Sequence, residues 1–166
     1  MAPVEAPFDV VVTTGSGFPL DQNLYQSVKG MSAAAQVCRP DGLIICAAEC
    51  VDGFPDHGSY REVLTSADSP EALLELIAAR EVTVPNQWQV QVQARIQAAH
   101  RVAVYTDGVT ADDLAQAHLD RSTDIAATIA AEAERLGRAP SVCVLPEGPQ
   151  TIPYVHAGRA QGKVNA

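Results

Sequence analysis

The chain has 166 residues, of which 47% are hydrophobic and 19% are charged. This composition indicates one globular domain and excludes a disordered chain. With 20 acidic and 11 basic side chains the net charge is −9. Nucleic acids and anionic membrane surfaces bind clusters of Lys and Arg, so we expect no nucleic-acid and no membrane partner. The sequence has no basic leader and no apolar run of the roughly 20 residues that span a bilayer. Its four cysteines are expected to be structural thiols, which indicates a reducing compartment, so we expect a cytoplasmic protein.

Four short apolar runs predict the strands of a central sheet, at residues 10–13, 43–47, 102–105 and 142–145. Each run is continuous rather than alternating, which is typical of parallel strands covered on both faces. Helical patterns separate the runs. This order predicts an α/β three-layer sandwich, with a mainly parallel central sheet of at least four strands flanked by helices. We expect a single domain over residues 1–155 and a disordered tail over 156–166.

The first helix is expected over residues 21–38, with Asp21 as its N-cap. Apolar residues recur on one side at the helical period. The opposite side carries three polar residues, Gln22, Gln26 and Lys29. Such a face is ordinarily just solvated. However, two amides and one ammonium also suit the recognition of carboxylate and hydroxyl groups.

Three further helices are predicted. Ser69 and Pro70 begin one of them, because Ser caps a helix and Pro fits its first turn. Residues 87–100 alternate like a strand but also fit a helix; we favour a helix because no turn signal precedes the strand at 102–105. Residues 124–136 form the clearest helix, which Gly137 ends.

The loops that follow the first three strands are candidate ligand sites, because ligands bind beyond the carboxyl ends of parallel strands. Residues 13–19 contain a G-x-G but neither a third Gly nor the Lys of a phosphate loop, so we favour a tight turn over a nucleotide site. Glu49 and Asp52 follow the second strand. Acidic residues in such loops either form turns or take part in catalysis.

The cysteine and histidine positions do not predict a metal site. None of the four cysteines forms a C-x-x-C pair, and the four histidines have no i, i+4 pair. We therefore expect buried structural thiols and no metal in this chain.

Three segments together resemble a known family. They are GFPLDQNLYQSVKGMSAA, RPDGLIICAAECVDG and VPNQWQVQVQARI. They resemble the C-terminal domain of the nickel-pincer-nucleotide-dependent lactate racemase family, which includes related 2-hydroxyacid racemases and epimerases. The resemblance extends over roughly residues 8–155.

The resemblance implies a two-domain enzyme whose active site lies between the domains. A 2-hydroxyacid would lose a hydride, form a 2-keto acid and regain the hydride on its other face. The N-terminal domain of the family holds the nickel-pincer nucleotide and supplies the acid and base. This chain would then be part of a larger enzyme, and we expect it to be inactive without that domain.

The resemblance also implies roles for residues of this chain. Gln26 and Lys29 would face the carboxylate or hydroxyl of the substrate, and Trp88 would close over the site. We expect Gln22, Glu49 and Asp52 to line the cleft, and we assign no catalytic residue and no role to His57 in the loop 54–60. Two alternatives stay open, a free-standing module that binds a small anion or nucleotide and a non-catalytic docking domain.

Overall fold

A computed structural model of the chain describes residues 1–56 and 58–156. Its centre is a five-stranded sheet in which every neighbouring pair is parallel, in the order β5-β4-β3-β2-β6. The strands are β2 (Phe8–Thr14), β3 (Cys38–Ala47), β4 (Arg101–Tyr105), β5 (Asp120–Ser122) and β6 (Val142–Leu145). All four predicted strands and their parallel arrangement are confirmed.

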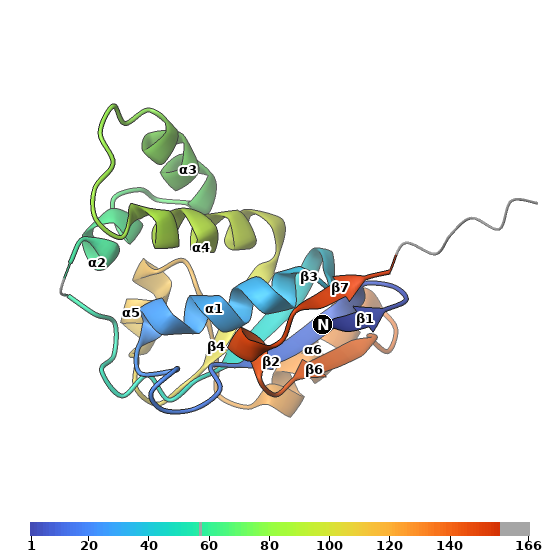
Figure 1. The fold of residues 1–166 in the computed structure, drawn as a ribbon. Helices are drawn as coiled ribbons and strands as arrows, with labels where there is room; N and C mark the ends of the chain where they lie inside the picture. The colour runs from blue at the N-terminus through green and yellow to red at the C-terminus, as the bar shows by residue number, and fades with distance from the viewer. Residues whose placement is uncertain (57, 157–166) are drawn as a thin grey trace, which may run out of the picture.

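Helices cover both faces of the sheet, as Figure 1 shows. The helices α1 (Leu24–Ala35) and α4 (Gln87–Ala99) cover one face, with α2 (Tyr60–Leu64) and α3 (Pro70–Ala78) packed beyond them. The short α5 (Ala111–Gln116) connects β4 to β5, and α6 (Ile125–Leu136) covers the opposite face. The chain moves from β2 to β5 in one direction and then returns to β6, so right-handed crossovers are expected to place α6 on the other side.

The two halves of the core differ in size. Beneath α1 and α4, the apolar side chains of the sheet join those of five helices in one large cluster. On the α6 side only five buried residues form a cluster, against which Ile125 and Ile129 pack. The site described below is built on the larger half.

The sheet edges depart from the prediction. Val142 and Val144 in β6 are 39% and 62% exposed, so the expectation that this strand is covered on both faces is wrong. As an edge strand, β6 lies outside the small cluster beneath α6. The sequence analysis did not predict β5, nor the small parallel pair of β1 (Ala2–Val4) and β7 (Pro153–Val155).

The helix boundaries show which capping residues were interpreted correctly. Ser69 caps α3 as expected, Asp124 caps α6, and Gly137 ends α6 as expected with a φ of 65°. The prediction for α1 is wrong at both ends. Asn23 caps the helix instead of Asp21, and α1 ends at Ala35 because β3 begins at Cys38.

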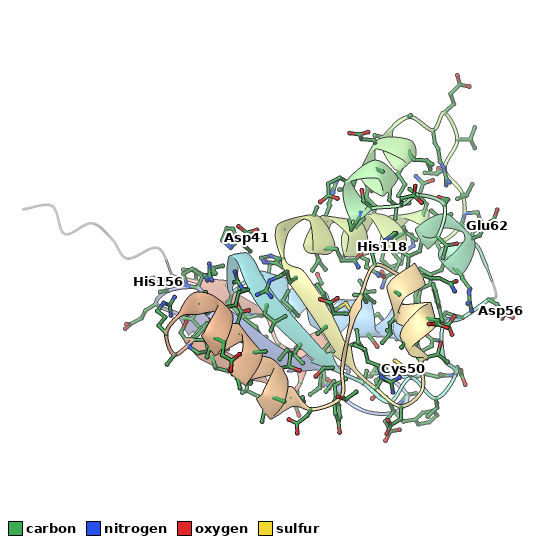
Figure 2. All side chains as sticks on the ribbon, turned by 180° about the vertical axis from the view of Figure 1, so that it is seen from behind. Asp41, Cys50, Asp56, Glu62, His118 and His156 are labelled. Atoms are coloured by element: carbon green, nitrogen blue, oxygen red, sulfur yellow. The ribbon has the colours of Figure 1, made fainter. Side chains whose placement is uncertain are left out.

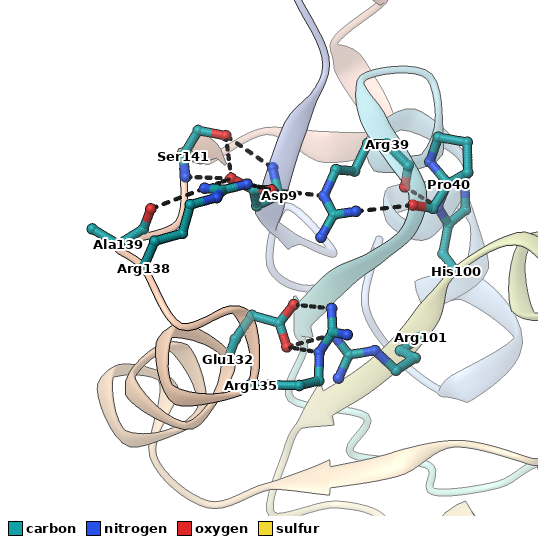
Figure 3. A network of polar contacts seen from close by, with 10 residues as sticks. All are labelled: Asp9, Arg39, Pro40, His100, Arg101, Glu132, Arg135, Arg138, Ala139 and Ser141. Atoms are coloured by element: carbon teal, nitrogen blue, oxygen red, sulfur yellow. Dashed lines mark hydrogen bonds and ion pairs between the residues drawn. The ribbon is translucent and has the colours of Figure 1, made fainter.

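A buried carboxylate joins three segments at the amino-terminal edge of the sheet (Figure 3). Asp9 in β2 accepts hydrogen bonds from Arg138 at 2.7 and 2.8 Å, from Arg39 at 2.6 Å, and from the amide and hydroxyl of Ser141. These donors, Arg138 foremost, hold the pKa of Asp9 well below its ordinary value. In the same region Glu132 of α6 pairs with Arg135 and Arg101, which lowers its pKa as well.

The four cysteines are free. Cys38, Cys46 and Cys50 are buried, and burial raises the pKa of Cys38 to about 12. Within the described residues, no helix has the length and apolar character needed to cross a membrane. Of the predicted tail only His156 is described, and its amide donates to the carbonyl of Val4 at 2.8 Å; residues 157–166 lie outside the described residues.

Candidate functional site

The loops beyond the carboxyl ends of β2, β3 and β4 are tied together by hydrogen bonds. The amide of Gly15 donates to the carbonyl of Ala47 at 3.0 Å, and that of Ala48 donates to the carbonyl of Tyr105 at 3.1 Å. Figure 2 shows Cys50 at this edge, where its amide donates to the carbonyl of Asp21 at 3.0 Å. These bonds make the edge a fixed frame on which side chains can be positioned.

The glycine-rich loop after β2 is a tight turn, as the sequence analysis favoured. Ser16 and Gly17 both have positive φ, 67° and 71°, where Gly is favoured. The amides of Gly15 and Ser16 already donate within the protein, so they do not form a free cradle for a phosphate.

The strand order reverses between β2 and β6, and another segment of the chain occupies the crevice at that point. The short helix η1 (Gly148–Gln150) lies there, and a Cβ added at Gly148 would come within 2.3 Å of the Thr13 hydroxyl oxygen. Ligands commonly bind at such a switch point. In this chain that position is closed, and the open surfaces lie along α1 and beyond β3 and β4.

The first open surface is a groove of about 310 Å³ between α1 and α4. Lys29 and Trp88 line it on its two sides, with Val28, Ser32, Gln89 and Val92. Trp88 is 58% exposed, which is unusual for the only Trp of a chain with a large core. The Lys29 ammonium donates to the Gln26 side-chain oxygen at 2.5 Å, so these two residues form a pair next to the indole.

Tyr25 connects this groove to the core, and the sequence analysis missed it. Its ring meets Trp88 edge to face at 6.1 Å between centroids, and it meets Tyr60 in the same way at 5.1 Å. The Gln89 side chain donates to the Tyr25 carbonyl at 2.7 Å, which joins α4 to α1. Tyr25 also lines, with Gln26, a second pocket of about 320 Å³. The sequence signal that could have identified Tyr25 is its position directly before Gln26 in the segment GFPLDQNLYQSVKGMSAA.

Gln22 does not share the helix face predicted for it. It precedes α1, and its amide donates to the carboxylate of Asp52, while the Asp52 backbone amide donates to the Gln22 carbonyl at 2.9 Å. The two residues therefore lock the start of α1 to the loop after β3. The Lys29 groove and the neighbouring pocket are lined by other residues.

Glu49 belongs to a different pocket, of about 580 Å³, beyond β3 and β4. The six candidate residues thus form separate groups. Lys29 lines the groove with Trp88 and bonds Gln26 of the neighbouring pocket, Gln22 pairs with Asp52, and Glu49 lies in its own pocket. His57 lies outside the described residues.

Within residues 1–56 and 58–156, no three His, Cys, Asp or Glu side chains are grouped so that they could hold a metal ion. The α1–α4 groove offers instead one cation and a flat apolar wall, and the Gln26 side chain lies beside it. Lys and Gln can bind a carboxylate and a hydroxyl, and an indole can exclude water from them. The groove is thus suited to a small, polar, anionic molecule.

Comparison with known proteins gives a consistent result. Residues 4–152 match the model of the lactate racemase C-terminal domain. The chain is 35% identical over 147 residues to the lactate racemase of Thermoanaerobacterium thermosaccharolyticum, covering 88% of this chain and 34% of that protein. It is 35% identical over 142 residues to the lactate racemase of Lactiplantibacillus plantarum, covering 84% and 33%.

A solved structure agrees with these matches. The lactate racemase apoprotein of Thermoanaerobacterium thermosaccharolyticum superposes with a TM-score of 0.82 and 32% identity, over 93% of this chain and 37% of that chain. This chain therefore spans about a third of the length of the relatives it matches. With its fold and nearly its whole length matched, the chain belongs to the lactate racemase C-terminal domain family.

Proposed function

We propose that this chain forms the substrate-binding wall of a 2-hydroxyacid racemase or epimerase, and that it acts together with an N-terminal domain of the lactate racemase type. The relatives named lactate racemase are about three times as long as the matched region, which supports a second domain as the partner. Catalysis would then require both domains, and this chain alone would be inactive.

The observation that carries the proposal is that Lys29 and Trp88 line one groove, while Gln26, hydrogen bonded to Lys29, lines the pocket beside it. In the proposed complex the ammonium of Lys29 donates to the substrate carboxylate, and the Gln26 amide bonds the same carboxylate or the 2-hydroxyl. Trp88 covers them, so the charge-assisted hydrogen bond forms in a drier environment, where it is stronger. Trp88 is 58% exposed in this chain, which is consistent with an indole that the other domain covers.

The proposal assigns no nickel ligand to this chain, because its described residues contain no fitting cluster. The nickel-pincer nucleotide of the family would be held by the N-terminal domain. When bound there, it would supply hydride abstraction and return through a 2-keto acid. The role of this chain is to bind and orient the substrate and to exclude water.

Tryptophan fluorescence can test the binding role directly, because Trp88 is the only Trp. We expect lactate to change the Trp88 emission saturably, whereas lactamide, which lacks the carboxylate, has a much smaller effect. The change should be lost in Lys29→Ala and kept in Arg95→Ala, which removes an exposed cation from α4. An equal response in Lys29→Ala, or equal responses to lactate and lactamide, would refute the assignment.

A further inference from the structure

The pocket of about 580 Å³ beyond β3 and β4 is separate from the α1–α4 groove. Its lining residues are Asp21, Ala47, Ala48, Glu49, Val51, Tyr105, Thr106, Asp107 and Gly108, and none of them lines the groove or the pocket beside it. Val51 and Tyr105 are 60% and 43% exposed. The pocket therefore combines apolar surface with three carboxylates, and the proposed function uses neither.

Several hydrogen-bond donors of this pocket are already engaged. The Thr106 hydroxyl donates to the Glu49 carbonyl at 3.0 Å and accepts from the Gly108 amide at 3.0 Å. The Glu49 amide donates to the Asp21 carboxylate at 3.1 Å. The wall also carries three carboxylates, so it favours a ligand that brings hydrogen-bond donors of its own.

Asp21 gives an independent indication of a ligand. Its side chain is only 4% exposed, and one of its two carboxylate oxygens is buried without any hydrogen-bond partner in the described part of the chain. Buried carboxylate oxygens are nearly always paired, because an unpaired one carries the full desolvation penalty. No ion pair among the described residues involves Asp21, Glu49 or Asp107.

We propose that this pocket binds an organic cation, an ammonium or guanidinium group on a flat apolar body. The cation would lie between the exposed carboxylates of Glu49 and Asp107 and pair with the buried carboxylate of Asp21 behind them, while its apolar part packs on Val51 and Tyr105. The three carboxylates are not placed as metal ligands, so a metal ion does not meet the same requirement. The cation is either an Arg side chain of another polypeptide segment or a free amine.

The test is an NMR titration of the ¹⁵N-labelled chain with benzylamine, and with benzyl alcohol and benzoate as neutral and anionic analogues. We expect benzylamine to shift the amide signals of Glu49 and Gly108 saturably, and the two analogues to bind much more weakly. Asp21→Asn should weaken benzylamine binding about tenfold to hundredfold, the range of a lost charge-assisted hydrogen bond. Glu134→Gln, which removes an exposed charge from α6 on the opposite face, should leave it unchanged.

A parallel titration with N-acetyl-arginine amide separates the two sources. Tighter binding of this compound than of benzylamine supports an Arg side chain as occupant, and the reverse supports a free amine. If Asp21→Asn fails to fold, benzylamine binding is measured instead in Glu49→Gln and Asp107→Asn, which replace exposed side chains. The absence of saturable shifts, equal binding of benzyl alcohol, or unchanged affinity in the carboxylate variants would overturn the proposal.

Discussion

Gln93 is the residue whose replacement should most clearly show what holds α4 in place. Its side chain is fully buried; its oxygen accepts from the Tyr60 hydroxyl, and its amide donates to the Ala117 carbonyl at 3.2 Å. In Gln93→Leu the Ala117 carbonyl keeps a second donor, Gln97, at 2.9 Å. The Tyr60 hydroxyl, in a side chain only 1% exposed, loses its partner. One buried unpaired hydroxyl costs about 1–3 kcal/mol of unfolding free energy.

Urea denaturation followed by circular dichroism measures this loss, and a double-mutant cycle assigns it. We expect Gln93→Leu and Tyr60→Phe each to destabilise the chain, and the double variant to lose about 1–2 kcal/mol less than the sum of the two, because neither partner is then left unpaired. Gln91→Leu is the matched control on the same helix. Its half-buried side chain makes no hydrogen bond in the described part of the chain, so its effect should stay within about 0.5 kcal/mol. Strict additivity in the cycle would refute the reasoning.

Two further predictions concern the charge network and the thiols. The pKa of Asp9 is depressed in the folded chain, so its contribution to stability is present above the unfolded value of about 4 and is lost as the pH falls below it. The melting temperature of Asp9→Asn should therefore fall less between pH 7 and pH 3 than that of the unmodified chain; parallel curves would contradict this. Because burial raises the pKa of the Cys46 thiol, mass spectrometry should find half-buried Cys143 alkylated first and Cys46 only after unfolding. Rapid labelling of Cys46 in the folded chain would contradict that order.

The strands were predictable where burial dictates composition. The apolar runs of β2, β3 and β4 are buried by helices on both faces, and the sequence pattern records this directly. β5 is three residues long and reads Asp-Arg-Ser, so its pairing with β4 leaves no apolar signal. The edge strand β6 carries an apolar run although part of it is exposed. An apolar run alone therefore does not distinguish a strand covered on both faces from a partly exposed edge strand.

The start of α1 was mispredicted because Asp21 and Asn23 are both good capping residues. A tertiary contact decides between them, since the Asp21 carboxylate accepts from the Glu49 amide 28 residues away. The glutamines of α4 show the same limit. Gln89 and Gln93 are buried, but their partners include carbonyls of Tyr25 and Ala117, distant in sequence. The sequence predicted a helix over residues 87–100, and only the fold shows what its buried amides bind.

The structure groups the predicted site residues differently from the sequence prediction. Gln26, Lys29 and Trp88 were predicted from the sequence; in the structure Lys29 and Trp88 line the α1–α4 groove, and Gln26 bonds Lys29 from the neighbouring pocket. Gln22 was placed on the same helical face because the helix was started three residues too early. Tyr25 was missed because an apolar aromatic in a helix is ordinarily attributed to the core.

Racemisation of lactate by the proposed two-domain enzyme tests the central claim most directly, with Lys29 replaced by Ala or Arg. Lys29 is exposed on α1 and makes no core contact, so the variants should fold with an unchanged melting temperature. Loss of a charge-assisted hydrogen bond to the substrate should lower kcat/KM about tenfold to several hundredfold in Lys29→Ala. Arg should restore only part of this, because its planar fork differs from an ammonium. Full racemisation activity in Lys29→Ala would contradict the account.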